Sequence, residues 1–106
     1  MLKVNRIRTY ETEGVTVVEL HGRLNLDSRG LDEFRGEIRR LLRSGVRRFV
    51  LDLKHVKSID STGIGEIVAA RNSITEWGGE FSLVNASSRI QGVLSIIELT
   101  NVLDGF

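Results

Sequence analysis

The segment Asp60-Ser61-Thr62-Gly63-Ile64-Gly65 holds the residues whose types and spacing best suit chemistry. An aspartate, a serine and a threonine stand together where an apolar helical pattern begins, and two glycines follow. The start of a helix favours negative charge, because its first N–H groups lack helical partners and the helix dipole is positive there. A phosphate on Ser61 would be tolerated locally and would add about −1.5 to −2 charges to a docking surface. Glycines at 63 and 65 leave room for a partner to approach.

The same segment also fits a purely structural role. Asp, Ser and Thr are common N-cap residues, so Asp60, Ser61 or Thr62 could simply cap the helix. The spacing alone leaves both interpretations open.

Enzymatic and metal chemistry find less support. His21 and His55 are the only histidines, the chain has no cysteine, and no HExxH-type spacing is present, so the sequence predicts no metal site. Ser61 is not surrounded by a G-x-S-x-G motif, and the glycines that follow it lack the lysine of a phosphate-binding loop. We therefore expect no catalytic residues and no cofactor, and we expect His21 at the rim where a strand ends.

The charge and hydropathy of the chain argue against nucleic acid and membrane as its partners. The formal net charge is only +1, and the arginine-rich stretch 35–48 contains no interleaved aromatic residues between Arg35 and Arg48. Asp32, Glu33 and Glu37 lie at helical distances from these arginines, which indicates a solvated helix face rather than a nucleic-acid surface. No apolar run reaches the roughly 20 residues that span a bilayer, and the first residues do not show the pattern expected of a signal peptide. We expect a cytoplasmic protein that inserts in no membrane.

The spacing of apolar residues predicts the strands and helices that would position Ser61. Strands are predicted over 4–10, 15–20, 49–53 and 81–84, and loops over 22–28 and from Leu53 to Ile64. Apolar residues at helical spacing predict a helix from Asp27 or Ser28 to Gly45, a second over 62–77, and a third that carries Ile90, Val93, Leu94 and Ile97. Residues 1–106 therefore read as one α/β domain with a mixed, mostly parallel four-stranded sheet and amphipathic helices packed against it. Loops at the carboxyl ends of such strands commonly form sites.

The ordered set of motifs resembles the STAS domain family, and the resemblance covers nearly the whole chain. The segments that carry it are Val17-Val18-Glu19-Leu20-His21-Gly22-Arg23-Leu24, Phe49-Val50-Leu51-Asp52-Leu53 through Ile59-Asp60-Ser61-Thr62-Gly63, Gly78-Gly79 before Phe81-Ser82-Leu83-Val84, and Ile97-Glu98-Leu99-Thr100. The chain is most similar to the stand-alone bacterial anti-sigma factor antagonists. That group has a phosphorylated serine directly after the loop aspartate, and Ser61 holds that position.

The resemblance implies a switch. Unphosphorylated protein would bind an anti-sigma factor that is also a serine kinase and so release a sigma factor; phosphorylation of Ser61 would break the complex, and a phosphatase would restore it. Asp60, Thr62, Gly63, Ile64, Gly65 and Asn25 would form the partner-binding loops. Asn25 departs from the family, which often has an acidic residue there, although Asp27 lies close by. The oligomeric state is left open, and the alternative is a non-catalytic STAS subunit of a larger signalling or transport assembly that phosphorylation does not switch.

Overall fold

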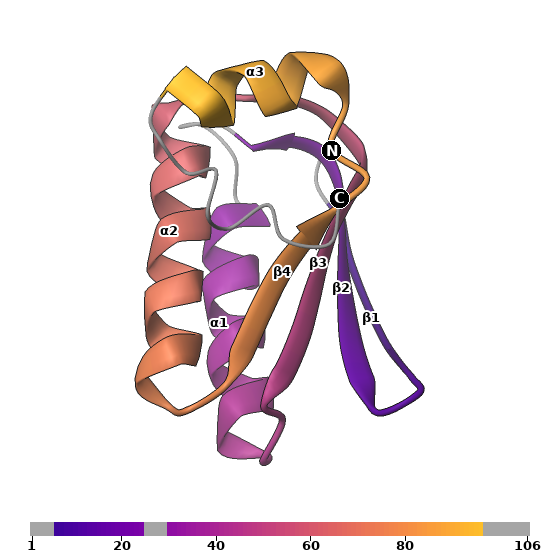
Figure 1. The fold of residues 1–106 in the computed structure, drawn as a ribbon, viewed down its shortest axis with the longest axis vertical. Coiled ribbons are helices and arrows are strands. Elements are labelled where there is room, and N and C mark those ends of the chain that lie inside the picture. The colour runs from indigo at the N-terminus through magenta and orange to yellow at the C-terminus, as the bar shows by residue number, and fades with distance from the viewer. Residues whose placement is uncertain (1–5, 25–29, 97–106) are drawn as a thin grey trace.

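Four strands and three helices make up the computed structural model, which describes residues 6–24 and 30–96. In chain order the elements are β1 (Arg6–Thr12), β2 (Val15–Leu24), α1 (Gly30–Arg43), β3 (Arg48–Ile59), α2 (Ser61–Glu76), β4 (Glu80–Val84) and α3 (Ser88–Ile96). The strands form one sheet in the order β1-β2-β3-β4, in which β1 and β2 are antiparallel and the other pairs are parallel (Figure 1). The predicted α/β class and the mixed, mostly parallel four-stranded sheet are confirmed.

A tight hairpin joins the antiparallel pair. Glu13 and Gly14 occupy its two central positions with φ of 53° and 81°, and the flanking residues Thr12 and Val15 are paired. Positive φ at both central positions suits a hairpin turn because its twist matches that of the strands. Within the described residues the first strand covers Arg6–Thr12 and so runs two residues past its predicted end; residues 4 and 5 of the predicted strand lie outside the described residues.

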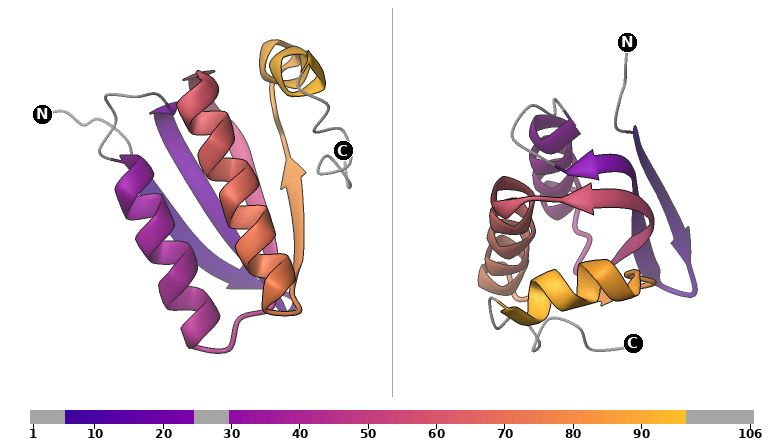
Figure 2. Two further views of the ribbon diagram at one scale, coloured as in Figure 1. Left: turned by 90° about the vertical axis from the view of Figure 1, so that its left-hand side faces the viewer. Right: turned by 90° about the horizontal axis from the view of Figure 1, so that it is seen from above.

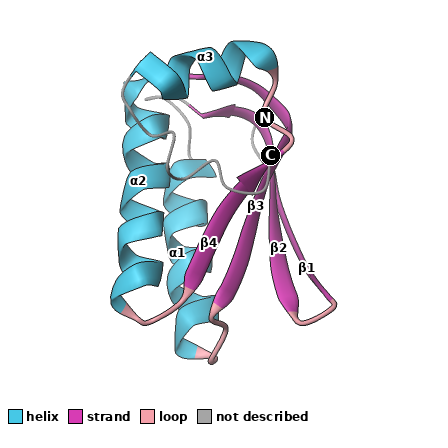
Figure 3. Ribbon diagram, in the orientation of Figure 1, coloured by secondary structure: helices cyan, strands magenta, loops and turns pink. Residues whose placement is uncertain are grey.

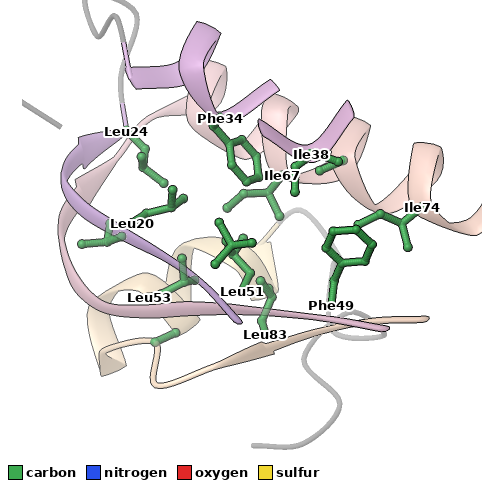
Figure 4. Close-up of a cluster of buried hydrophobic side chains, with 14 of the residues drawn as sticks. Leu20, Leu24, Phe34, Ile38, Phe49, Leu51, Leu53, Ile67, Ile74 and Leu83 are labelled. Carbon is green, nitrogen blue, oxygen red and sulfur yellow. The ribbon is translucent and has the colours of Figure 1, made fainter. Parts of the chain in front are cut away.

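Helices α1 and α2 lie side by side against one face of the sheet, and α3 lies at the end of the sheet where α2 begins (Figures 1 and 2). Figure 3 shows the same arrangement coloured by secondary structure. The apolar stripes of α1 and α2 meet the inward side chains of the strands, as amphipathic helices should. Ten core side chains are labelled in Figure 4: Leu20, Leu24, Phe34, Ile38, Phe49, Leu51, Leu53, Ile67, Ile74 and Leu83.

Strands β2 and β3 extend beyond their predicted ends. Residues 22–24 and 54–59, both predicted to be loop, are paired strand: Gly22 pairs with Val56 and Leu24 with Ile59. The ladder shifts register twice, between Glu19 and His21 and between Gly22 and Arg23. Each shift places an extra residue in β3, which breaks the two-residue alternation that marks a strand in sequence. The prediction of a loop from Leu53 to Ile64 was wrong for this reason.

The arginine-rich stretch is held by ion pairs along α1. Arg40 donates to Glu37 Oε1 and Oε2 at 2.9 and 2.8 Å, which confirms the predicted pairing at helical distance. Arg35 bonds Glu66 of α2, with its Nε 3.2 Å from Oε1, and so links the two helices. Within the described residues, no helix combines the length and apolar character that crossing a bilayer requires.

Candidate functional site

The start of α2 is fixed by Asp60. Its backbone is extended (φ −115°, ψ −173°), and its carboxylate Oδ1 accepts a hydrogen bond from the N–H of Gly63 at 3.0 Å, the geometry of an N-cap. The backbone N–H of Asp60 donates to the carbonyl of Leu24 at 3.0 Å, which ties the cap to the end of β2. Of the three residues that could have capped the helix, the aspartate does so.

Gly63 allows α2 to approach the sheet closely. A Cβ atom at this position would lie 2.3 Å from the carbonyl oxygen of Leu24, 2.8 Å from Leu24 Cβ and 2.9 Å from Ile59 Cγ1. The packing of α2 on β2 and β3 therefore requires glycine at position 63, because any side chain there would point into the core. Gly65 differs, because a Cβ there would meet nothing within 4 Å and the residue is exposed.

The predicted site residues divide by exposure. Ser61, the first residue of α2, and Gly65 are exposed, Asp60 and Thr62 are half-buried, and Gly63 and Ile64 are buried. Among the described residues, none is hydrogen-bonded to the Ser61 hydroxyl. An incoming protein would thus meet Ser61 and Gly65 first, while Gly63 and Ile64 hold the segment in place. Asn25 and Asp27 lie outside the described residues.

A second group of polar side chains lies on the face of the sheet opposite α1 and α2. Glu19 and His21 are two residues apart on β2, so their side chains share a face. His21 Nε2 lies 3.0 Å from Glu19 Oε1, and the rings of His21 and His55 stack with centroids 4.4 Å apart and planes 10° apart. His55 comes from β3, where it pairs with His21 across the ladder. We call Glu19, His21 and His55 the Glu-His-His cluster.

The Glu19 carboxylate is the buried member of the Glu-His-His cluster. Its residue is 7% exposed, and Arg8 Nη1 approaches its Oε2 at 3.4 Å. The hydrogen bond with His21 holds the pKa of Glu19 below its ordinary value, against the desolvation that would raise it, and the positive charge of Arg8 adds to the lowering. Glu19 is therefore an ionised carboxylate beside two imidazoles.

Sequence reasoning did not find the Glu-His-His cluster. It placed His21 at the rim where a strand ends, whereas β2 continues through His21 to Leu24. The expectation of no metal site, which rested on the lack of cysteine and of HExxH-type spacing, stays a prediction; the structure nevertheless brings the ligand atoms of Glu19, His21 and His55 within 4.8 Å of one another. The alternation of Glu19 and His21 was a visible signal, but the partner on another strand depended on a register that the sequence did not reveal.

Asp52 is a further buried carboxylate on that face, directly across the ladder from Glu19. Its Oδ1 accepts hydrogen bonds from the N–H of Lys54 at 2.9 Å and from Asn85 Nδ2 at 3.1 Å. Asn85 adopts a positive φ of 62° directly after β4. Asp52 therefore joins β3 to the segment that leads into α3, which is a structural role.

Over most of its length this chain is similar to proteins of one domain family. The STAS domain model matches residues 6–106. A Thermotoga neapolitana protein, named as a candidate anti-sigma factor antagonist and TM1081 homolog, is 33% identical over 97 residues, which cover 86% of this chain and 80% of that protein.

Two solved structures show the same fold. The crystal structure of a candidate anti-sigma factor antagonist (TM1081) from Thermotoga maritima has a TM-score of 0.75 at 28% identity, covering 92% of this chain and 82% of that chain. The phosphorylated form of the Bacillus cell fate determinant SpoIIAA has a TM-score of 0.73 at 19% identity, covering 92% of this chain and 88% of that one.

Proposed function

The chain belongs to the STAS domain family, and on that premise we propose that it is an anti-sigma factor antagonist switched by phosphorylation of Ser61. Unphosphorylated, it binds an anti-sigma factor that is also a serine kinase, and a sigma factor is released. Phosphate on Ser61 breaks the complex, and a phosphatase restores it. In this role the chain is a binding protein with no catalytic residues of its own.

One observation carries the proposal: Ser61 is exposed, and the residue before it, Asp60, already caps α2. Asp60 supplies the N-cap, so the fold does not need the Ser61 hydroxyl for capping. The hydroxyl stands at the first residue of α2 and is exposed to a kinase. Relatives with the same fold are named as candidate anti-sigma factor antagonists, and SpoIIAA has been solved in a phosphorylated form.

The physics of the switch rests on desolvation. A partner that docks over Ser61 removes water from that surface, and a phosphate there would bury close to two negative charges. Burying such a charge without a matched cation costs several kcal/mol, and every 1.4 kcal/mol is about a tenfold loss of affinity. The N-terminal position of Ser61 on α2 stabilises the phosphate in the free protein. The modified chain is therefore stable alone and disfavoured in the complex.

The test is a comparison of binding partners retained from the host's lysate by the wild type, Ser61→Ala and Ser61→Asp. We expect the wild type and Ser61→Ala to retain a kinase. The Ser61→Asp variant should retain at least about tenfold less of it, because even one added charge opposes docking. Incubation of the retained complex with ATP, followed by mass spectrometry, should place phosphate on Ser61, and Thr62→Ala should leave this phosphorylation in place.

Ser88 offers a matched control. It is also an exposed serine at the first residue of a helix, α3, whose N–H at Ile90 is capped by the hydroxyl of Ser87. Ser88→Asp adds the same charge in the same local setting and should retain the kinase. If all the variants recover the same partners, the proposed switch is wrong and the chain acts instead as an unswitched subunit of a larger assembly.

A further inference from the structure

The Glu-His-His cluster has the composition and placement of a metal site. Two of its members alternate along β2 and the third is their neighbour on β3, so three side chains project from one face toward a common point. Their ligand atoms all lie within 4.8 Å of one another. The cluster lies on the opposite face of the sheet from α1 and α2 and contains none of the residues assigned to the switch.

The ligand types select the metal. Imidazole nitrogen suits zinc, copper, nickel and iron, whereas magnesium and calcium prefer sites built from oxygen alone. Two histidines and one carboxylate are a common ligand set for zinc, which then keeps one of four positions for water or another ligand.

We propose that Glu19, His21 and His55 bind one divalent zinc-like cation on the outer face of the sheet, with one coordination position left for water or for an atom of a docking partner. Glu19 is held in place by burial and supplies the charge that a dication requires. The cation takes the place of the hydrogen bond between His21 Nε2 and Glu19 Oε1: Nε2 becomes the ligand atom, and the neutral imidazole carries its one proton on Nδ1.

Two local adjustments complete the site. The rings of His21 and His55 are nearly parallel, so they must tilt before a nitrogen of each can point at one metal; His55 is exposed and has room to turn. Arg8 competes with the metal, since its guanidinium sits 3.4 Å from Glu19 Oε2, but its side chain is 67% exposed and can move into solvent. The arginine therefore weakens the site without blocking it.

Metal binding to the tag-free full chain is the direct test. Calorimetric titration with Zn²⁺ should give one site per chain with a dissociation constant of about 10 μM or tighter, and Mg²⁺ should give none. Co²⁺ should produce visible absorption bands from a bound ion. His55→Ala should weaken binding by about tenfold or more, and it changes an exposed side chain that the core does not need.

Matched variants separate a lost site from a lost fold. Glu19→Gln should also weaken binding by about tenfold or more, whereas the same change at the exposed Glu11 of β1 should leave it intact. Arg8→Gln should tighten binding several-fold, because it removes a positive charge beside the dication, and misfolding cannot produce such a gain. Absence of saturable zinc binding at about 100 μM, or equal affinity of the wild type and His55→Ala, would overturn the proposal.

Discussion

The two faces of the sheet are built on different principles. The face toward α1 and α2 is mainly apolar, with Leu20, Leu51 and Leu53 each no more than 2% exposed. The opposite face carries the Glu-His-His cluster and the buried Asp52, which are held by specific hydrogen bonds and a ring stack. Burial of apolar area stabilises the fold with little demand on geometry, whereas polar groups contribute only when each partner is in place. The first face therefore supplies most of the apolar burial, and the second holds polar groups whose geometry is specific.

The sharpest test of this contrast uses two neighbours on β3 that point to opposite faces. Leu51 is 1% exposed in the core, and Val50 is half-buried on the other side. Leu51→Ala should lower the free energy of unfolding by about 3 kcal/mol, because it leaves a cavity between the sheet and the helices. Val50→Ala should cost about 1 kcal/mol. Urea denaturation of both variants measures the two losses of unfolding free energy. Equal losses would contradict the conclusion that the helix-covered face contributes more to stability than the opposite face.

A second comparison concerns the two glycines that open α2. Gly63→Ala should destabilise the protein by about 2 to 3 kcal/mol, since its Cβ would overlap the Leu24 carbonyl oxygen and force the helix off the sheet. Gly65→Ala meets open space and should stabilise it by about 0.5 to 1 kcal/mol through helix propensity. Thermal melts followed by circular dichroism should move in opposite directions; a shift of the same sign in both would mean that α2 does not rest on β2 through Gly63.

The smallest expected effect lies at the polar rim of the helix-covered face. Glu37 accepts a hydrogen bond from the Thr9 hydroxyl at 2.9 Å and pairs with Arg40, and the bond with Arg40 is the main reason that the pKa of Glu37 lies below its ordinary value of 4.5. A lowered folded-state pKa stabilises the protein above about pH 4.5, and this stabilisation is lost as the pH falls through the folded-state value.

Glu37→Gln should therefore cost about 0.5 kcal/mol at neutral pH and progressively less below pH 4.5, where the wild-type carboxylate becomes protonated. Urea denaturation across the acidic range checks this trend. Glu33→Gln, at an exposed position on the same helix, serves as the control. A constant difference between the wild type and Glu37→Gln at every pH would show that the charge of Glu37 has no part in linking α1 to β1.

Local patterns predicted the parts of the structure that local forces determine. The apolar stripe that includes Phe34 and Ile38 on α1 correctly indicated a buried helix face, and the small and hydroxyl residues at 60–63 correctly indicated the start of a helix. The extension of β3 to Ile59 escaped prediction because Lys54 and His55 are both exposed and interrupt the alternation. The meeting of His21 with His55 escaped it because a pair between strands depends on register, which the whole sheet sets.

The first register shift between β2 and β3 has a consequence for insertions and deletions. In an unshifted ladder, Lys54 would stand opposite His21, and His55 would be turned toward the helices. Because of the extra residue, His21 pairs with His55 instead of Lys54, and the side chain of Val56, which is 6% exposed, points into the core. A chain that lost Lys54 alone would still set His55 beside His21 and Val56 in the core, now on a regular strand. Loss of the residue at this single position would thus preserve both faces. A deletion two residues earlier in β3 would instead turn Leu53 from the core to the opposite face.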